Sequence, residues 1–144
     1  MLGVFSAIDI SASGLTAERT RMNTIASNLA NAQTTRTAAG GAYKRVDPVF
    51  EAIALDKMHA LTPSERSVSQ VKVTQIVQDQ RHGHMVYSPG HPDANKDGYL
   101  EYPNVNVVEE MVNMISASRA YEAGISSVEA TQKMASSALD LGRV

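Results

Sequence analysis

The first thirty residues carry apolar side chains at helical spacing. Over residues 4–31 apolar residues recur every three or four positions, except where Arg19 stands between Leu15 and Met22, and one set recurs every seven. A strict seven-residue repeat is typical of the narrow seam between supercoiled helices, whereas a helix on a globular core has a broader apolar stripe. The spacing predicts a coiled-coil helix that ends near Asn31, since Asn is second only to Gly in the left-handed position after a helix. Its predicted seam is Ile8, Leu15, Met22 and Leu29.

Residues 105–141 carry the same period over a longer stretch, without a break. We expect Asn104 or Asn106 to cap this second helix, and Glu109 and Glu110 suit the positive end of its dipole. Gly124, in the middle of this predicted helix, is a weak helix former. The residues that we predict on its seam are Met111, Met114, Tyr121, Ile125, Val128 and Leu139.

The segment between the two predicted helices has strand and turn character. Residues 43–53 and 68–78 predict strands, and residues 84–87 predict a short third strand. Prolines and glycines divide the rest into turns. The two helices therefore flank a small β-containing insert.

The order of these elements predicts a mainly α fold with a small β insert. A seam shared by both helices brings them together most simply as an antiparallel pair of long N- and C-terminal coiled-coil helices, joined by a small β-containing middle domain. The predicted divisions are 1–32, 33–104 and 105–144. At about 1.5 Å per residue, both helices are longer than a compact domain of this size covers, so we expect parts of each to contact other molecules.

Composition and charge argue against several classes of protein. The 13 basic and 15 acidic residues give a formal charge of -2, so no strong positive field attracts nucleic acid or an anionic membrane surface. The absence of cysteine removes disulfides, thiolate metal sites and cysteine nucleophiles. Residues 1–9 have no basic region, and Asp9 interrupts their apolar run, which predicts no cleaved signal peptide. No apolar stretch reaches the length of a membrane span.

One short segment resembles the first part of a calcium-binding loop. Asp93, Asn95 and Asp97 supply oxygen atoms at the right spacing, and Gly98 follows them. The match fails at the twelfth position, where Asn104 replaces the required glutamate. Because Asp, Asn and Gly also form tight turns, we interpret this segment as a structural turn. A calcium-responsive binding module stays the alternative, and a calcium titration distinguishes the two.

Three histidines suggest a second possible metal site. His82, His84 and His91 lie close in sequence, but no fourth ligand follows at a diagnostic spacing. The sequence also lacks the motifs of serine hydrolases, phosphate-binding loops and zinc proteases. We therefore predict no catalytic residue, no metal site and no cofactor.

Two motifs carry a resemblance to a known family. Residues 26–35, which include Ser-Asn-Leu-Ala-Asn-Ala, resemble the segment that closes the first helix of the flagellar axial proteins of the rod and hook. Residues 97–115 and 117–123 resemble the basal-body rod proteins of this family. The short insert agrees, since distal-rod and hook relatives have larger middle domains. The motif residues are Asn28, Leu29, Asn31, Gly98, Tyr99, Pro103, Asn104, Arg119 and Tyr121.

The resemblance implies a structural subunit of the proximal rod of the bacterial flagellar basal body. Such a subunit forms part of a hollow drive shaft that transmits torque and conducts exported subunits. The resemblance also implies assembly in the periplasm after export by the flagellar type III apparatus, without a cleaved signal. The implied partners are other copies of the chain, the rod proteins FlgB, FlgF, FlgG and FliE, and the export apparatus; no nucleic acid or small-molecule substrate is implied.

A soluble coiled-coil adaptor, unrelated to flagella, is a further alternative. It would depend on the two heptad helices alone. Such an adaptor should form a closed dimer or trimer, whereas a rod subunit should form an open helical stack. The oligomeric state therefore distinguishes them.

Overall fold

The computed structural model describes residues 2–54 and 69–141. The chain divides into two compact units. Unit 1 contains the described residues of 1–20, 49–75 and 117–144, and unit 2 contains 21–48 and 76–116. In chain order the elements are α1 (Leu2–Ala30), β1 (Val46–Ala54), β2 (Ser69–Gln78), β3 (Met85–Tyr87), β4 (Tyr99–Glu101) and α3 (Val107–Leu141).

Both predicted helices are present, and their ends differ from the prediction by no more than two residues. The start of α3 is capped by Asn106, whose side-chain oxygen accepts hydrogen bonds from the backbone N–H groups of Val108 at 3.1 Å and Glu109 at 3.4 Å. Of the two predicted caps, Asn106 is therefore the correct one. Asn104 has a different role in unit 2.

The end of α1 differs from the prediction in its conformation. Asn31 follows the last helical residue, as expected, but no non-glycine residue in the described part of the chain has a positive φ. The prediction of a left-handed Asn31 was wrong. Its side-chain amide instead donates to the carbonyl oxygen of Ser27 at 2.9 Å, and its side-chain oxygen accepts from Thr34 at 3.2 Å. These two hydrogen bonds close the helix without the left-handed turn.

The strands form two small sheets. β1 and β2 pair in one two-stranded sheet, and β3 and β4 pair in another. The second sheet is antiparallel, with Val86 opposite Leu100 and Tyr87 opposite Tyr99. β1, β2 and β3 were predicted, whereas β4 was not, because three residues that follow a turn give no periodic signal.

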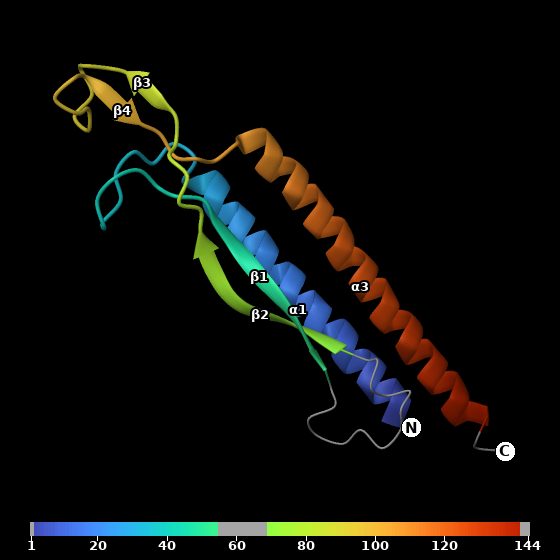
Figure 1. The fold of residues 1–144 in the computed structure, drawn as a ribbon. Coiled ribbons are helices and arrows are strands. Elements are labelled where there is room, and N and C mark those ends of the chain that lie inside the picture. Colours follow the sequence, from blue (N-terminus) through green and yellow to red (C-terminus); the bar gives the residue numbers. More distant parts are fainter. Residues whose placement is uncertain (1, 55–68, 142–144) are drawn as a thin grey trace. The chain divides into compact units, whose positions relative to one another are not determined.

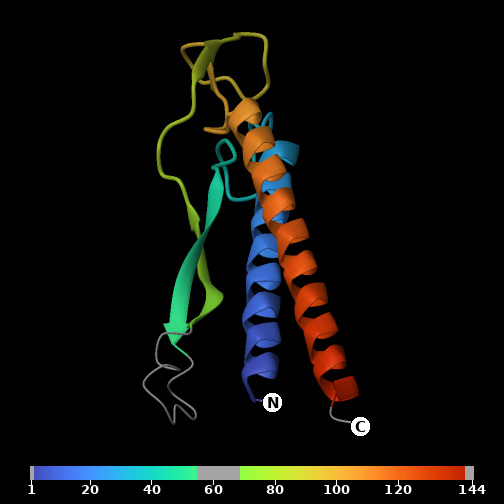
Figure 2. The same ribbon diagram turned by 90° about the vertical axis from the view of Figure 1, so that its right-hand side faces the viewer.

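Unit 1 brings part of α1 beside part of α3, as both ribbon views show (Figures 1 and 2). The contact depends on Gly124: a Cβ atom at this position would lie 2.8 Å from Cδ2 of Leu15. Ala17 and Ala117 are buried in the same unit. The glycine that weakens the helix in isolation therefore allows a close approach between the helices.

Unit 2 has a core that is partly polar. Leu100, Pro103 and Ile25 are buried there, together with Asn28 and Glu110. Glu110 is 0% exposed. A carboxylate is buried this fully only where other groups supply hydrogen bonds and an opposite charge, so the partners of Glu110 are important for the structure of unit 2. In the part of the chain that the structure describes, neither helix has a stretch apolar enough to cross a membrane.

Candidate assembly interface

The segment proposed as a turn forms one in the structure. The side-chain oxygen of Asn95 accepts the backbone N–H groups of Asp97 at 3.0 Å and Tyr99 at 2.9 Å. Gly98 has a φ of 78°, the left-handed conformation that the turn interpretation required. Asp93 accepts a hydrogen bond from Thr35 at 2.9 Å. The side-chain oxygens of Asn95 and Asp93 therefore have partners within the fold.

The three histidines have separate surroundings. His82 lies 3.3 Å from Glu101, His84 stacks on the ring of Tyr102, and His91 accepts from the backbone N–H of Asp93. Among residues 2–54 and 69–141, no three His, Asp or Glu side chains gather in a way that could hold a metal ion.

Asn28 is fully buried in unit 2. Its amide nitrogen donates to the carbonyl oxygen of Val46 at 2.9 Å and to Oε2 of Glu110 at 3.0 Å. Its side-chain oxygen accepts from the N–H of Val46 and from the hydroxyl of Tyr43, both at 3.0 Å. All four hydrogen-bonding positions of the amide are used, which makes its burial possible. This one side chain connects α1, the start of β1 and the start of α3.

Arg45 neutralises the buried carboxylate. Its Nε donates to Oε1 of Glu110 at 2.7 Å, and its Nη1 pairs with Asp47. Burial of the guanidinium acts to lower the pKa of Arg45, but the hydrogen bond to Glu110 and the charge of Asp47 outweigh burial, so this pKa is raised. Both oxygens of Glu110 thus have charged or polar partners. We call Asn28, Arg45 and Glu110 the buried polar cluster.

Asn104 extends this framework to the loop after β2. Its side-chain oxygen accepts from the N–H of Arg45 at 2.7 Å, and its amide donates to the carbonyl oxygens of Asp79 and Arg81. Arg81 also donates side-chain hydrogen bonds to Asp79, which lower the pKa of Asp79 to about 2. Several motif residues of the sequence therefore hold unit 2 together, and the buried Pro103 lies beside Asn104 in the chain.

The predicted seam residues do not all face the interior. Ile8, Leu15, Met22 and Leu29 are half-buried, and so are Met114, Tyr121 and Val128. By contrast, Met111, Ile125 and Leu139 are exposed, at 54%, 39% and 56%. The motif residue Arg119 is exposed as well. The buried positions of α3 are Glu110 and Ala117, together with half-buried residues that include Met114, Tyr121, Gly124, Val128, Thr131 and Ala135.

At some positions of α3, the residue that lies inward is therefore the one immediately before the predicted seam residue. The period predicted Met111 and Ile125, whereas the structure turns Glu110 and Gly124 inward. The buried Glu110 and the close contact at Gly124 explain the difference, because neither is visible in a hydrophobic period. Whether the exposed seam residues contact other subunits stays a prediction.

This difference leaves an exposed apolar face on unit 2. It consists of Val108, Met111, Val112 and Ile115, which follow one another at helical spacing and are 70%, 54%, 61% and 55% exposed. We call these four residues the outer apolar face. An exposed apolar face of this kind is typical of interaction surfaces. Of these four residues, the seven-residue period placed only Met111 on the predicted seam.

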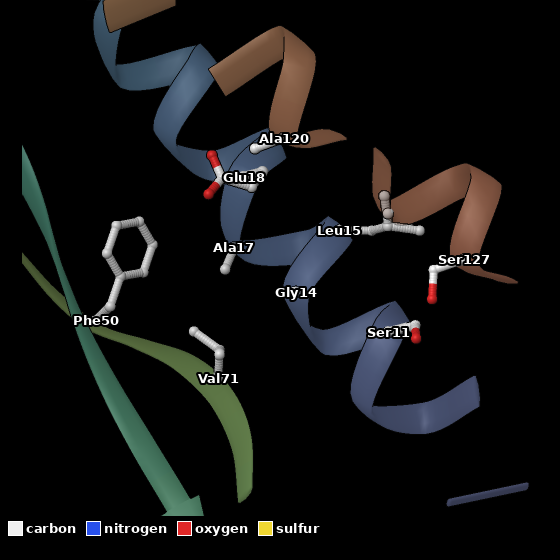
Figure 3. A pocket seen from close by; sticks show the side chains of 10 residues that line it. Ser11, Gly14, Leu15, Ala17, Glu18, Phe50, Val71, Ala120 and Ser127 are labelled. Carbon is white, nitrogen blue, oxygen red and sulfur yellow. The ribbon is translucent and has the colours of Figure 1, made fainter. Parts of the chain in front are cut away.

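Unit 1 contains a groove of about 460 Å³. Phe50 of β1 and Val71 of β2 lie opposite Ala17 of α1, while Leu15 points toward α3 (Figure 3). The groove is lined mostly by apolar and small side chains and has no cluster of chemically reactive groups.

Comparisons with known proteins agree with this picture of a structural protein. Residues 8–36 match the family model described as flagella basal body rod protein. Residues 96–141 match the model described as flagellar basal body rod FlgEFG protein C-terminal. The fold and both terminal matches thus define the class: a flagellar basal-body rod protein.

Relatives along the whole chain narrow this class. The chain is 41% identical to flagellar basal-body rod protein FlgC of Borreliella burgdorferi, over 96% of this chain and 97% of the relative. It is 36% identical to FlgC of Bacillus subtilis, over 96% and 98%, and 37% identical to FlgC of Salmonella typhimurium, over 99% and 100%. The chain belongs to the FlgC family, and its function is that of a structural rod subunit of the flagellar basal body. The resemblance found in the sequence is thereby confirmed.

Proposed function

We propose that this chain forms part of the proximal rod and assembles through its two terminal helices. The observation that carries the proposal is the similarity to rod proteins over nearly the full chain, both helices included. The exposed apolar residues of α3 support it, because a soluble monomer gains nothing from leaving four neighbouring apolar side chains in water. In this proposal the rod is a hollow shaft that transmits torque and conducts exported subunits.

The proposal includes an antiparallel coiled-coil arrangement of α1 and α3. Two contacts support this arrangement. In unit 1, Leu15 approaches Gly124, and in unit 2, Asn28 bonds to Glu110. A residue in the middle of α1 thus contacts the middle of α3, and a residue near the end of α1 contacts the start of α3. In this scheme residues 1–32 and 105–144 carry assembly and residues 33–104 form the middle insert.

The proposed location and partners follow from the family. The rod proteins of the basal body interact with one another, and for this chain we propose FlgB, FlgF, FlgG and FliE together with further copies of itself. We also propose assembly in the periplasm after passage through the flagellar type III export apparatus, without a cleaved signal. The formal charge of -2 and the absence of cysteine are compatible with this route.

A charge at a predicted seam residue tests the proposal. Ile125→Asp should abolish rod and hook formation and swimming, because an unpaired carboxylate in a subunit contact costs several kcal/mol and the cost recurs in every subunit. Complementation of a strain that lacks the gene, with immunoblots for the protein, gives the measurement. A control in the predicted insert, such as Lys57→Ala, lies outside the described residues, so a matched control on α3 is preferable.

The matched control is Ser126→Asp, which adds the same charge at the exposed neighbouring position. It should leave swimming closer to normal. Full motility of the Ile125→Asp strain, or an equal loss in both strains, would show that the α3 seam does not carry assembly.

A further inference from the structure

In the first turns of α3 a charged residue is buried while several apolar residues are exposed. Glu110 is 0% exposed, while the outer apolar face, made of Val108, Met111, Val112 and Ile115, is more than half exposed throughout. Asn113, a polar residue, is also partly buried. Here Glu110 and Asn113 lie toward the interior of unit 2 together with the half-buried Met114, while the four residues of the outer apolar face lie toward water.

The hydrophobic effect alone would choose a different rotation. Successive residues of a helix are about 100° apart, so turning α3 by one residue would bring Met111 into the place of Glu110. Ile115, one helical turn further on, would move inward with it. That rotation would remove apolar surface from water and expose a carboxylate, both of which are favourable. The seven-residue period likewise predicts Met111 on the inward side.

The buried polar cluster opposes this rotation. Glu110 receives Nε of Arg45 at 2.7 Å on one oxygen and the amide of Asn28 at 3.0 Å on the other. These bonds are directional, and none of them can form if the helix turns by about 100°. A buried ion pair usually contributes little net stability compared with apolar residues of similar size, whereas buried polar groups can select one packing among several.

We propose that the buried polar cluster is a positioning device that fixes the rotation of the start of α3 and so turns the outer apolar face outward. Asn28, Arg45 and Glu110 are positioning residues for assembly in this view, and they need not contact another subunit themselves. The inference rests on the proposed function, because a rod subunit has neighbouring rod subunits that cover such a face. In this view the cluster makes the free chain less stable than the rotated packing would be, and in return it presents the outer apolar face to the neighbouring subunits of the rod.

The absence of cysteine makes a direct test possible, since a single introduced thiol is the only one in the chain. Ile115→Cys places it on the exposed face and Asn113→Cys on the half-buried side. The labelling rates of the two thiols are measured in the purified full-length chain. Each cysteine substitution is made in three backgrounds. The first is the native chain, and the second is the double variant Arg45→Met with Glu110→Met, which removes both buried charges together. The third is Glu109→Met, a change at an exposed neighbouring residue that serves as the control.

We expect Ile115→Cys to react faster than Asn113→Cys in the native background and in the control. In the double variant this ratio should fall several-fold or invert, because Met111 and Ile115 move inward. Should the double variant lose its helical circular dichroism, Glu110→Gln supplies the same comparison with a smaller shift in the same direction. An unchanged ratio in a folded variant without the cluster would overturn the proposal.

Motility separates this inference from the proposed function. If the ratio changes and the same variants also fail to build a rod, both ideas are supported. If the ratio changes while motility is normal, the cluster sets the rotation but assembly does not use the outer apolar face. The labelling result stands on its own in either case, because it is measured on the free chain.

Discussion

The two units of this chain are held together by different kinds of contact. In unit 1, small residues let α1 and α3 approach closely, with Leu15 against the bare backbone of Gly124. In unit 2, Asn28 and Glu110 are buried and linked by directional hydrogen bonds. Apolar contacts favour closeness but tolerate several rotations, whereas directional bonds favour a single one. In our proposal, the few polar residues of unit 2 therefore fix the orientation of α3 at its start, which the apolar contact of unit 1 does not do.

The largest expected effect comes from breaking the polar contact in unit 2. Glu110→Ala leaves the guanidinium of Arg45 without its buried partner, and we expect a loss of about 3 kcal/mol in the free energy of unfolding. Urea-induced unfolding followed by circular dichroism measures this loss, and hydrogen exchange at residues 43–47 locates it. Glu109→Ala, at the exposed neighbour, should change stability by less than about 0.5 kcal/mol. Equal losses in the two variants would contradict a special role for Glu110.

The next effect concerns the turn of unit 2. Gly98→Val forces a β-branched residue to a φ of 78° and places its Cβ 2.9 Å from the ring of Tyr87, so we expect a loss of about 1–3 kcal/mol. Thermal unfolding checks this value. Gly90→Val is the control, because a Cβ there meets nothing within 4 Å. The loss should be the same with millimolar calcium and with chelator; a rise of several degrees in the melting temperature of the unmodified chain with calcium would favour a calcium site instead.

A smaller effect is expected at the apolar contact of unit 1. Gly124→Ala gains about 1 kcal/mol of helix propensity but crowds Cδ2 of Leu15, so the single variant should be close to neutral. Combined with Leu15→Ala, the same change should gain its full propensity. A double-mutant cycle should therefore show a coupling energy of about 0.5–1 kcal/mol. Simple additivity would mean that the two side chains do not compete for space.

The smallest effect concerns pH. In the folded chain the pKa of Asp79 is lowered from 3.8 to about 2 by the side chain of Arg81. A lowered folded-state pKa contributes stability above about pH 4, and this contribution is lost as the pH falls toward about 2. Asp79→Asn should flatten the acid limb of the stability curve slightly, because the pair is near the surface. An identical acid limb in both chains would show that this pair does not contribute.

The sequence was sufficient for the features that depend on neighbouring residues. The two helices and the positive φ of Gly98 follow from local rules of period and backbone freedom, and the capping rule reduced the choice to Asn104 or Asn106, of which the structure has Asn106. The strands β1 to β3 were likewise predicted, although β1 begins at Val46 and not at residue 43. The family was recognised from two short motifs, one of which contains Asn28. The motif gave no indication that Asn28 uses all four of its hydrogen-bonding positions.

The remaining features were decided by tertiary contacts. The end of α1 is an exception, because Asn31 bonds to Ser27 and Thr34, four and three residues away, and this local arrangement replaces the left-handed residue. Gly124, a weakness in an isolated helix, becomes a close contact once Leu15 lies opposite. Glu110 is inward because Arg45 and Asn28, distant in the sequence, meet its two oxygens. By itself the sequence determined which segments are helical, since helical period is local; only the tertiary structure decided which face of α3 is buried, since a charge can be buried only where distant partners converge on it.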